Sequence, residues 1–369
     1  MTQSPTSPHA LRPDPGRPKR LNTLDIAKGI GIILVIFAHV NYTPSLLTPI
    51  YSFHMPLFFI LSGMVFDCTK YPRLRQFLRR RWQTMILPYL FFSVLSLVYV
   101  FVSERLFAHA VDLKAGEYIS SFFQIFLAQG SSPVLNTPLW FVPCLFAVEL
   151  IYFYLSRFSK VICAAACFVL SCTGWLLQSG MLPFDNTLLP WTFDSTLYAM
   201  GFYAAGNLLG PRIRQTIEAA RTHPHKNGVC LGAFALFMIA WLPLMQMNGK
   251  VSLGSQVLHN GLLFFLTGML GTFAILSISI PLEKNRFLLY LGRNTFSLMS
   301  VHYMIRKFTM PKYYEMLNIP LYNRKVLSET ILPFLIVFAL SLLATAAYRA
   351  LMHGLSLLRR ALYVRSRSV

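Results

Sequence analysis

Residues 24–39 read LDIAKGIGIILVIFAH, an apolar run that keeps an Asp, a Lys and a His. A run of about 20 apolar residues crosses roughly 30 Å of hydrocarbon as a helix. Similar runs recur along the 369-residue chain, in which 55% of the residues are hydrophobic and only 12% are charged. The runs are continuous and not alternating, so they favour helices over a closed β-barrel. We therefore predict an all-α, polytopic bundle of transmembrane helices.

Ten membrane-spanning helices are predicted from these runs. A shorter apolar stretch, residues 117–130, is too short to span comfortably and is interpreted as an interfacial or re-entrant helix. No fixed-period repeat or long linker is apparent. One membrane domain, residues 24–353, is therefore predicted between two basic cytoplasmic tails, the Pro-rich and disordered segment 1–23 and the segment 354–369. The predicted spans are approximately 24–43, 49–67, 83–103, 138–157, 161–179, 193–210, 228–247, 257–281, 287–305 and 330–352.

The positions of Lys and Arg predict the orientation in the membrane. Besides the two tails, basic residues collect in four connections, residues 70–81, 157–160, 211–226 and 283–286. In a ten-helix bundle all of these lie on one side, which the positive-inside rule assigns to the cytoplasm. The net charge of +20 is therefore explained by topology, and no nucleic-acid partner is expected. One exception, the basic segment 306–328, lies on the predicted outer side, so either the last two spans are misassigned or this segment contacts something anionic.

Lys28 and His39 share one face of the first predicted helix. The eleven steps between them bring the two side chains to within about 20° of three full turns, with a rise of about 16 Å. Asp25 lies three residues before Lys28 and is expected to pair with it. Ionisable groups at membrane depth are functional candidates, and His exchanges a proton near neutral pH. The alternatives are a Lys28 that snorkels to the interface and a His39 that only hydrogen-bonds a neighbouring helix.

Two further groups of ionisable residues lie before and within later spans. Arg79, Arg80 and Arg81 belong to a basic segment that either determines topology or holds phosphate groups through charge-assisted bonds. Glu149 lies well inside the fourth predicted span, where a carboxylate is costly without a partner. Both a structural ion pair and a catalytic role are open for Glu149.

Glu149 and three more residues are candidates for binding a substrate. His54 lies near the outer end of the second predicted span, close to the expected depth of His39. Trp140 lies near a predicted interface, where aromatic residues are ordinary and only some of them stack on sugars. His302 lies within the ninth predicted span. Interfacial packing is the alternative for His54, and no definite step is assigned to His302.

Five phrases in order resemble the acyltransferase 3 family of membrane O-acyltransferases. The similarity extends over residues 22 to about 350 and is closest to the fucose 4-O-acetylase-like branch. The family has an Arg followed, after ten residues, by an essential His, and here Lys28 and His39 occupy these positions. Lys28 keeps the positive charge and loses the planar fork of Arg. The phrases are LDIAKGIGIILVIFAH (24–39), FHMPLFFILSGMVF (53–66), LWFVPCLF (139–146), FYAAGNLLG (202–210) and YLGRNTFSLMSVH (290–302).

The resemblance implies an O-acetyltransferase of a bacterial inner membrane. Acetyl-CoA would donate from the cytoplasm, and a sugar hydroxyl of an exopolysaccharide, a lipopolysaccharide or another surface glycan would accept, in association with the polysaccharide biosynthesis machinery. No metal or bound cofactor is expected. His39 would accept the proton of the hydroxyl, Lys28 and Arg79–Arg81 would hold the phosphates of CoA, and an acyl-His intermediate stays open.

The alternative class is a transporter or flippase of a lipid-linked sugar. In such a protein His39, Glu149 and His302 would form a proton relay inside the membrane. Many transporters have inverted repeats or pairs of broken helices, and neither is detectable in this sequence. The acyltransferase interpretation is therefore preferred.

Overall fold

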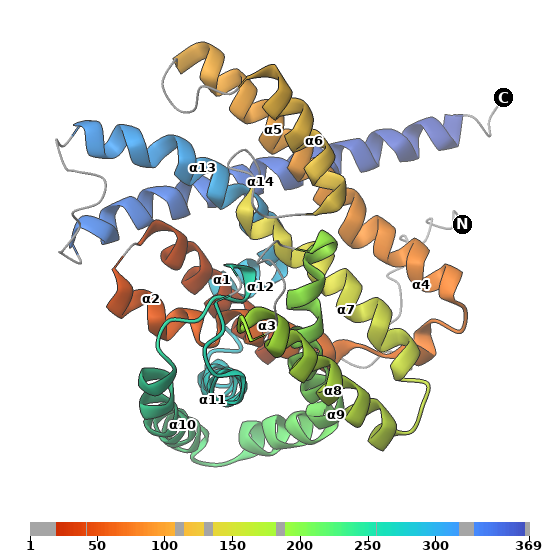
Figure 1. The fold of residues 1–369 in the computed structure, drawn as a ribbon, viewed down its shortest axis with the longest axis vertical. Helices are drawn as coiled ribbons and strands as arrows, with labels where there is room; N and C mark the ends of the chain where they lie inside the picture. Colours follow the sequence, from red (N-terminus) through yellow and green to blue (C-terminus); the bar gives the residue numbers. More distant parts are fainter. Residues whose placement is uncertain are drawn as a thin grey trace, which may run out of the picture.

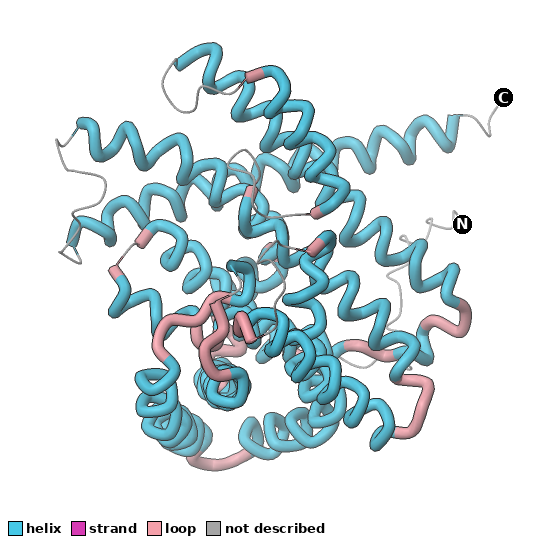
Figure 2. The backbone as a smooth tube through the Cα atoms, in the orientation of Figure 1, coloured by secondary structure: helices cyan, strands magenta, loops and turns pink. Residues whose placement is uncertain are grey.

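The computed structural model describes residues 20–41, 43–107, 114–128, 136–181, 189–255, 257–316 and 328–365. Helices make up nearly all of the described chain (Figures 1 and 2), and a single β-bridge, between Ser252 and Val257, is the only β-structure found there. The predicted all-α fold is confirmed. The α-helices are α1 (Asn22–Val40), α2 (Pro44–Tyr51), α3 (His54–Val65), α4 (Leu74–Arg81), α5 (Leu87–Phe107), α6 (Ala115–Leu127), α7 (Phe141–Leu155), α8 (Lys160–Gln178), α9 (Phe193–Thr222), α10 (Lys226–Asn248), α11 (Gly261–Ser279), α12 (Arg286–Arg293), α13 (Thr295–Met316) and α14 (Ser328–Arg365).

Eight helical stretches of the described chain are long and apolar enough to cross a membrane. They match eight of the ten predicted spans, and the polytopic bundle is confirmed. A ninth predicted span, 193–210, forms the first part of α9, which is largely buried against α3, α7 and α8. Its polar residues therefore face protein and not lipid. The eight stretches are Asn22–Val40, Pro44–Val65, Leu74–Val102, Thr137–Leu155, Lys160–Gln178, Lys226–Asn248, Gly261–Ser279 and Thr330–Leu357.

The predicted span 287–305 is not one straight helix. The chain leaves the helix at Asn294, which separates the short α12 from α13. The four residues Gly292–Thr295 interrupt the apolar run, and Gly and Asn are residue types that favour helix ends, so the sequence holds a sign of this break that the span prediction did not use. The helix α13 then continues to Met316, and it contains the first part of the basic segment that was predicted to be a loop. The rest of that segment, residues 317–327, lies outside the described residues.

The remaining elements differ from the predicted spans at their ends or in their breaks. The second predicted span consists of α2 and α3, which are separated at Ser52 and Phe53. A π-helical turn, Trp82–Ile86, joins α4 to α5. The short α6 packs on α5 and corresponds to the predicted interfacial helix. At the C-terminus α14 continues through Arg365, into the segment predicted as a tail.

The first helix lies at the centre of the bundle (Figure 1), where it contacts α2, α3, α11, α12, α13 and α14. Its cytoplasmic-side end, in the predicted orientation, approaches α12 at backbone distance. Gly29 faces the carbonyl group of Leu288, and Gly292 lies against the carbonyl group of Asp25, so a Cβ atom at either glycine would overlap the opposite backbone. Small residues allow membrane helices to approach in this way. The position of Lys28 on α1 is therefore fixed by α12.

Two apolar cores fill the bundle. One is built mainly from α3, α7, α9 and α11, with Phe59, Phe202 and Phe264 fully buried. The other joins α1 to α5, α13 and α14 through residues such as Ile36 and Leu298. The functional candidates lie where these two cores meet.

Candidate active site

A cavity of about 300 Å³ lies along α1, with walls from both apolar cores. Ile32, Val35 and His39 of α1 line it, and they follow Lys28 at four, seven and eleven residues. These steps place all four side chains on one face of the helix. The cavity therefore extends along the face of α1 that Lys28 and His39 share. It runs from His39 to a point about one helical turn, or about 6 Å, from Lys28.

The helix α13 forms the wall that faces α1. Thr295, Met299, Tyr303 and Arg306 of α13 line the cavity, and their spacing of four, four and three residues again defines one helical face. The helices α1 and α13 start at the same end of the bundle, because α12 packs against the beginning of α1 and directly precedes α13. The cavity thus lies between two helices that run in the same direction.

His39 contacts His302 of α13 behind the cavity wall. The Nδ1 atom of His39 lies 2.9 Å from the carbonyl oxygen of Val35 and 3.2 Å from Nε2 of His302. His302 is fully buried, and its Nδ1 atom lies 3.0 Å from the carbonyl oxygen of Leu298. His302 does not line the cavity, so the structure places it against His39 and not at the predicted substrate-binding position.

These partners assign the protons of the two neutral imidazoles. A carbonyl oxygen only accepts, so His302 carries its proton on Nδ1, donates it to Leu298 and presents a lone pair on Nε2. His39 then carries its proton on Nδ1 and donates it to Val35 and His302. The Nε2 atom of His39 is left with a lone pair and has no hydrogen-bond partner among the described residues. This is the tautomer that a general base requires.

Other predicted candidates also line the cavity. His54 is buried, and its Nδ1 atom lies 2.8 Å from the carbonyl oxygen of Ile50, so its Nε2 atom is again the acceptor. The ring of Tyr51 packs edge-on against His54, with 5.0 Å between centroids. Trp140, in a short 3₁₀-helix before α7, contributes to the same cavity. The structure therefore brings His39, His54 and Trp140 together.

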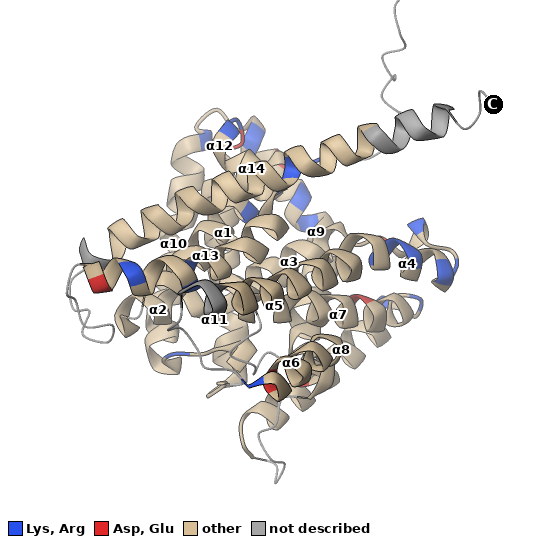
Figure 3. Cartoon of the chain, turned by 90° about the horizontal axis from the view of Figure 1, so that it is seen from above, with Lys and Arg blue, Asp and Glu red and all other residues tan. Residues whose placement is uncertain are grey.

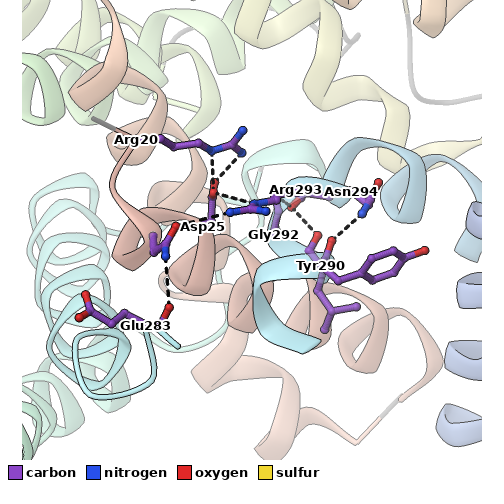
Figure 4. A network of polar contacts seen from close by, with 10 residues as sticks. Arg20, Asp25, Glu283, Tyr290, Gly292, Arg293 and Asn294 are labelled. Atoms are coloured by element: carbon purple, nitrogen blue, oxygen red, sulfur yellow. Dashed lines mark hydrogen bonds and ion pairs between the residues drawn. The ribbon is translucent and has the colours of Figure 1, made fainter. Parts of the chain in front are cut away.

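The predicted pair between Asp25 and Lys28 is not formed. The carboxylate of Asp25 instead accepts two hydrogen bonds from Arg20, at 2.7 and 2.9 Å, and lies 3.5 Å from Nε of Arg293 (Figure 4). Arg293 approaches Asp25 because α12 lies against this turn of α1, whereas Arg20 lies in the chain just before α1. A guanidinium group can bind a carboxylate with two parallel bonds. Lys28 is half-buried and has no ion-pair partner among the described residues.

The basic segment that contains Arg79, Arg80 and Arg81 divides into two parts. Arg79 and Arg80 are exposed on α4, where Lys and Arg gather as they do at α12 (Figure 3). Arg81 is different, because its Nε atom lies 2.5 Å from the carboxylate of Glu149 on α7. The hydroxyl group of Tyr203 on α9 also lies within 3.5 Å of that carboxylate. Neither Arg81 nor Glu149 lines the cavity. Their contacts with each other and with Tyr203 connect α4, α7 and α9.

The family model of the acyltransferase 3 family, described as an acyltransferase domain, matches residues 21–350. The chain belongs to the acyltransferase 3 family. No curated protein and no solved structure matched it. The eight apolar spans and the family together identify this acyltransferase as a multi-pass membrane enzyme.

Two tyrosines and two cations in the cavity of this acyltransferase were not predicted as site residues. Tyr51, Lys250, Tyr303 and Arg306 all line it. Only Arg306 had a signal in the sequence, since it belongs to the basic segment that contradicts the positive-inside rule. Tyr51 and Lys250 come from a short helix and a connection, and no spacing links them to His39.

Proposed function

We propose that this acyltransferase moves an acetyl group from cytoplasmic acetyl-CoA to a sugar hydroxyl of an exopolysaccharide, a lipopolysaccharide or another surface glycan. Its setting is a bacterial inner membrane, with both termini in the cytoplasm. The observation that carries the proposal is the cavity on the Lys28 face of α1, which has a base at one end and a cation about one turn beyond the other. Such an arrangement suits a donor and an acceptor that come from opposite sides.

Two further observations support the acceptor and the acyl group. The volume of about 300 Å³ is at the lower end for ligand pockets, which favours a small acyl group. The resemblance to the fucose 4-O-acetylase-like branch favours a sugar as the acceptor. Trp140 offers an aromatic face in the cavity, and His54 offers a hydrogen-bond acceptor.

The chemical step is a direct transfer. The sugar hydroxyl gives its proton to Nε2 of His39 while its oxygen attacks the carbonyl carbon of the thioester. The tetrahedral intermediate then collapses, the carbon–sulfur bond breaks, and the CoA thiolate takes the proton from His39. An acetyl ester and free CoA result. His302 accepts a hydrogen bond from Nδ1 of His39 and thereby holds the ring and stabilises the imidazolium form.

Lys28 is proposed to bind a phosphate group of CoA at the cytoplasmic mouth, with Arg79 and Arg80 on the same side. Lys28→Met is expected to raise the KM for acetyl-CoA about tenfold, because a hydrogen bond between charged groups contributes about 1.5 kcal/mol or more. Lys28→Arg, the family's usual residue, should restore the KM. Initial rates of CoA release by the purified chain in lipid nanodiscs measure both values, with Lys226→Met as a control. An unchanged KM in Lys28→Met would exclude the phosphate role.

His302 is proposed to act through His39 and not on a substrate. His302→Leu is therefore expected to lower kcat by about 10²-fold while both KM values stay close to those of the wild type. His302→Gln keeps an acceptor atom near the position of Nε2 and should retain most of the rate. The split between kcat and KM, measured in the same nanodisc assay, tests this role. Equal losses in the Leu and Gln variants would contradict it.

The proposed function is tested by the O-acetyl content of the host's surface and secreted glycans. NMR spectra are compared between a strain lacking the gene and the same strain complemented with the wild-type chain at a measured membrane level. We expect one acetyl resonance to be lost in the deletion strain and to return on complementation. Identical spectra would reject the proposed function.

A further inference from the structure

We propose that the acceptor of this acyltransferase is anionic, with a carboxylate or phosphate group near the hydroxyl that is acetylated, and that Arg306 and Lys250 bind this group. The inference rests on the proposed function and adds the chemical class of the acceptor. Two independent features of the cavity lead to it. These are the placement of the two cations and the absence of a topological reason for one of them.

Arg306 is held next to the proposed base. It lies three residues after Tyr303, on the face of α13 that lines the cavity. The centre of its guanidinium group lies 5.3 Å from the centroid of the Tyr303 ring, and that ring lies edge-on to His39, with 5.8 Å between centroids. A single aromatic ring therefore separates the cation from the imidazole that would take the acceptor's proton.

Lys250 repeats this arrangement on another wall. It follows α10 in the connection to α11, and its Nζ atom lies 5.7 Å from the centroid of Tyr51. Tyr51 in turn packs against His54. Each cation thus contacts a tyrosine that contacts a cavity histidine, and both cations line the same cavity.

The charge of the cavity favours an anion. Among the described residues that line it, Lys250 and Arg306 are cationic, and there is no Asp or Glu. The rest of the wall is largely apolar, which strengthens the attraction between a bound anion and these cations relative to bulk water. A guanidinium group binds carboxylate and phosphate oxygens with particular strength because it can donate two parallel hydrogen bonds.

Membrane topology does not explain Arg306. The cavity lies toward the end of α1 opposite to Asp25 and α12, which is the outer side in the proposed orientation. Lys and Arg are depleted on that side in most inner-membrane proteins. The first part of the basic segment nevertheless belongs to α13, and the residue of it that lines the cavity is Arg306. Binding of an anion accounts for a cation at this position.

The strain comparison described above gives the first test. The acetyl ester that depends on this chain should lie on a sugar that carries a carboxylate or phosphate, or next to one that does. An ester on a neutral sugar with neutral neighbours would overturn the inference while leaving the proposed function intact. If no acetyl ester depends on the chain, the proposed function fails and the inference fails with it.

Variants give the second test. The purified full-length chain in nanodiscs is assayed with acetyl-CoA and the polymer isolated from the deletion strain. Arg306→Gln and Lys250→Met are each expected to raise the KM for the polymer about tenfold. Lys312→Met removes the same charge from an exposed position of α13 outside the cavity and serves as the matched control. A KM unchanged in both cavity variants, or raised equally by Lys312→Met, would overturn the inference.

Chemical removal of the anion separates its two sources. The polymer is offered after reduction of its carboxylates to alcohols, or after removal of its phosphate groups. A rise in the KM for the polymer after reduction of the carboxylates identifies a carboxylate as the bound group. A rise in this KM after removal of the phosphate groups identifies a phosphate. In either case the treated polymer should no longer distinguish wild type from Arg306→Gln. A polymer that keeps its KM after both treatments would contradict the proposal.

Discussion

His39→Ala is expected to reduce acetyl transfer by about 10²-fold to 10⁴-fold, the range that a general base contributes. The reason is geometric, because the carbonyl oxygen of Val35 and Nε2 of His302 take the proton of Nδ1 and leave Nε2 as the only basic atom of the ring. No other described residue replaces it, since the Nε2 atom of His54 belongs to a different helix and a different wall. The measurement is acetyl ester formed per folded enzyme, in nanodiscs and in the complemented strain.

Controls separate chemistry from folding in this experiment. His353→Ala removes an exposed histidine from the last part of α14 and should behave as wild type. His39→Ala itself should be present in membranes at the wild-type level, because His39 is only partly buried and bears no structural charge pair. Wild-type acetylation by His39→Ala would reject the catalytic assignment. A radioactive acetyl group that stays on the wild-type chain after rapid quenching, and not on His39→Ala, would replace direct transfer by an acyl-His intermediate.

Helical geometry explains why the stripe on α1 could be predicted from the sequence. The spacing from Lys28 to His39 depends only on the local helix, and residues 24–39 are apolar enough to be helical in any membrane fold. The structure preserves this face as the wall of the cavity. The apolar run lengths predicted most of the spans for the same reason.

The errors in the prediction concern contacts between distant parts of the chain. Asp25 was expected to pair with its neighbour Lys28, but its partners are Arg20, which precedes the helix, and Arg293, which lies 268 residues away in the sequence. His302 was predicted to bind a substrate or, in the alternative interpretation, to belong to a relay with His39, and it contacts His39, 263 residues away in the sequence, directly. Pattern and propensity describe neighbours along one helix, and only the packing of α12 and α13 on α1 brings these residues together.

The buried pair between Arg81 and Glu149 also bears on the transporter alternative. A proton relay through His39, Glu149 and His302 would need contacts that connect the carboxylate to the histidines. In the described structure Glu149 instead contacts Arg81 and Tyr203, and Glu149 does not line the cavity. The two histidines contact each other without it. A structural role for Glu149 is therefore favoured. This role predicts a large loss of stability when only one partner of the pair is removed.

Glu149→Leu or Arg81→Met alone is expected to destabilise the fold by about 3–5 kcal/mol, because each leaves the other charge buried and unpaired. The side chains are only 6% and 19% exposed, so water cannot replace the missing partner. The double variant Arg81→Met with Glu149→Leu removes both charges and should recover most of the stability. By contrast, disrupting the exposed pair of Lys70 and Asp67 with Lys70→Met should cost less than about 1 kcal/mol.

Thermal unfolding of the purified chain measures these four variants, and the acetyl transfer rate per folded molecule gives the second readout. A structural pair predicts that the double variant is both stable and active. A relay that needs the carboxylate predicts a double variant that is stable and inactive, which would return Glu149 to the functional site. Additive losses in the double variant would instead show that the two charges act independently. The three outcomes therefore distinguish a structural ion pair from a proton pathway. The double variant has no unpaired charge, so a loss of activity in a stable double variant comes from the missing carboxylate.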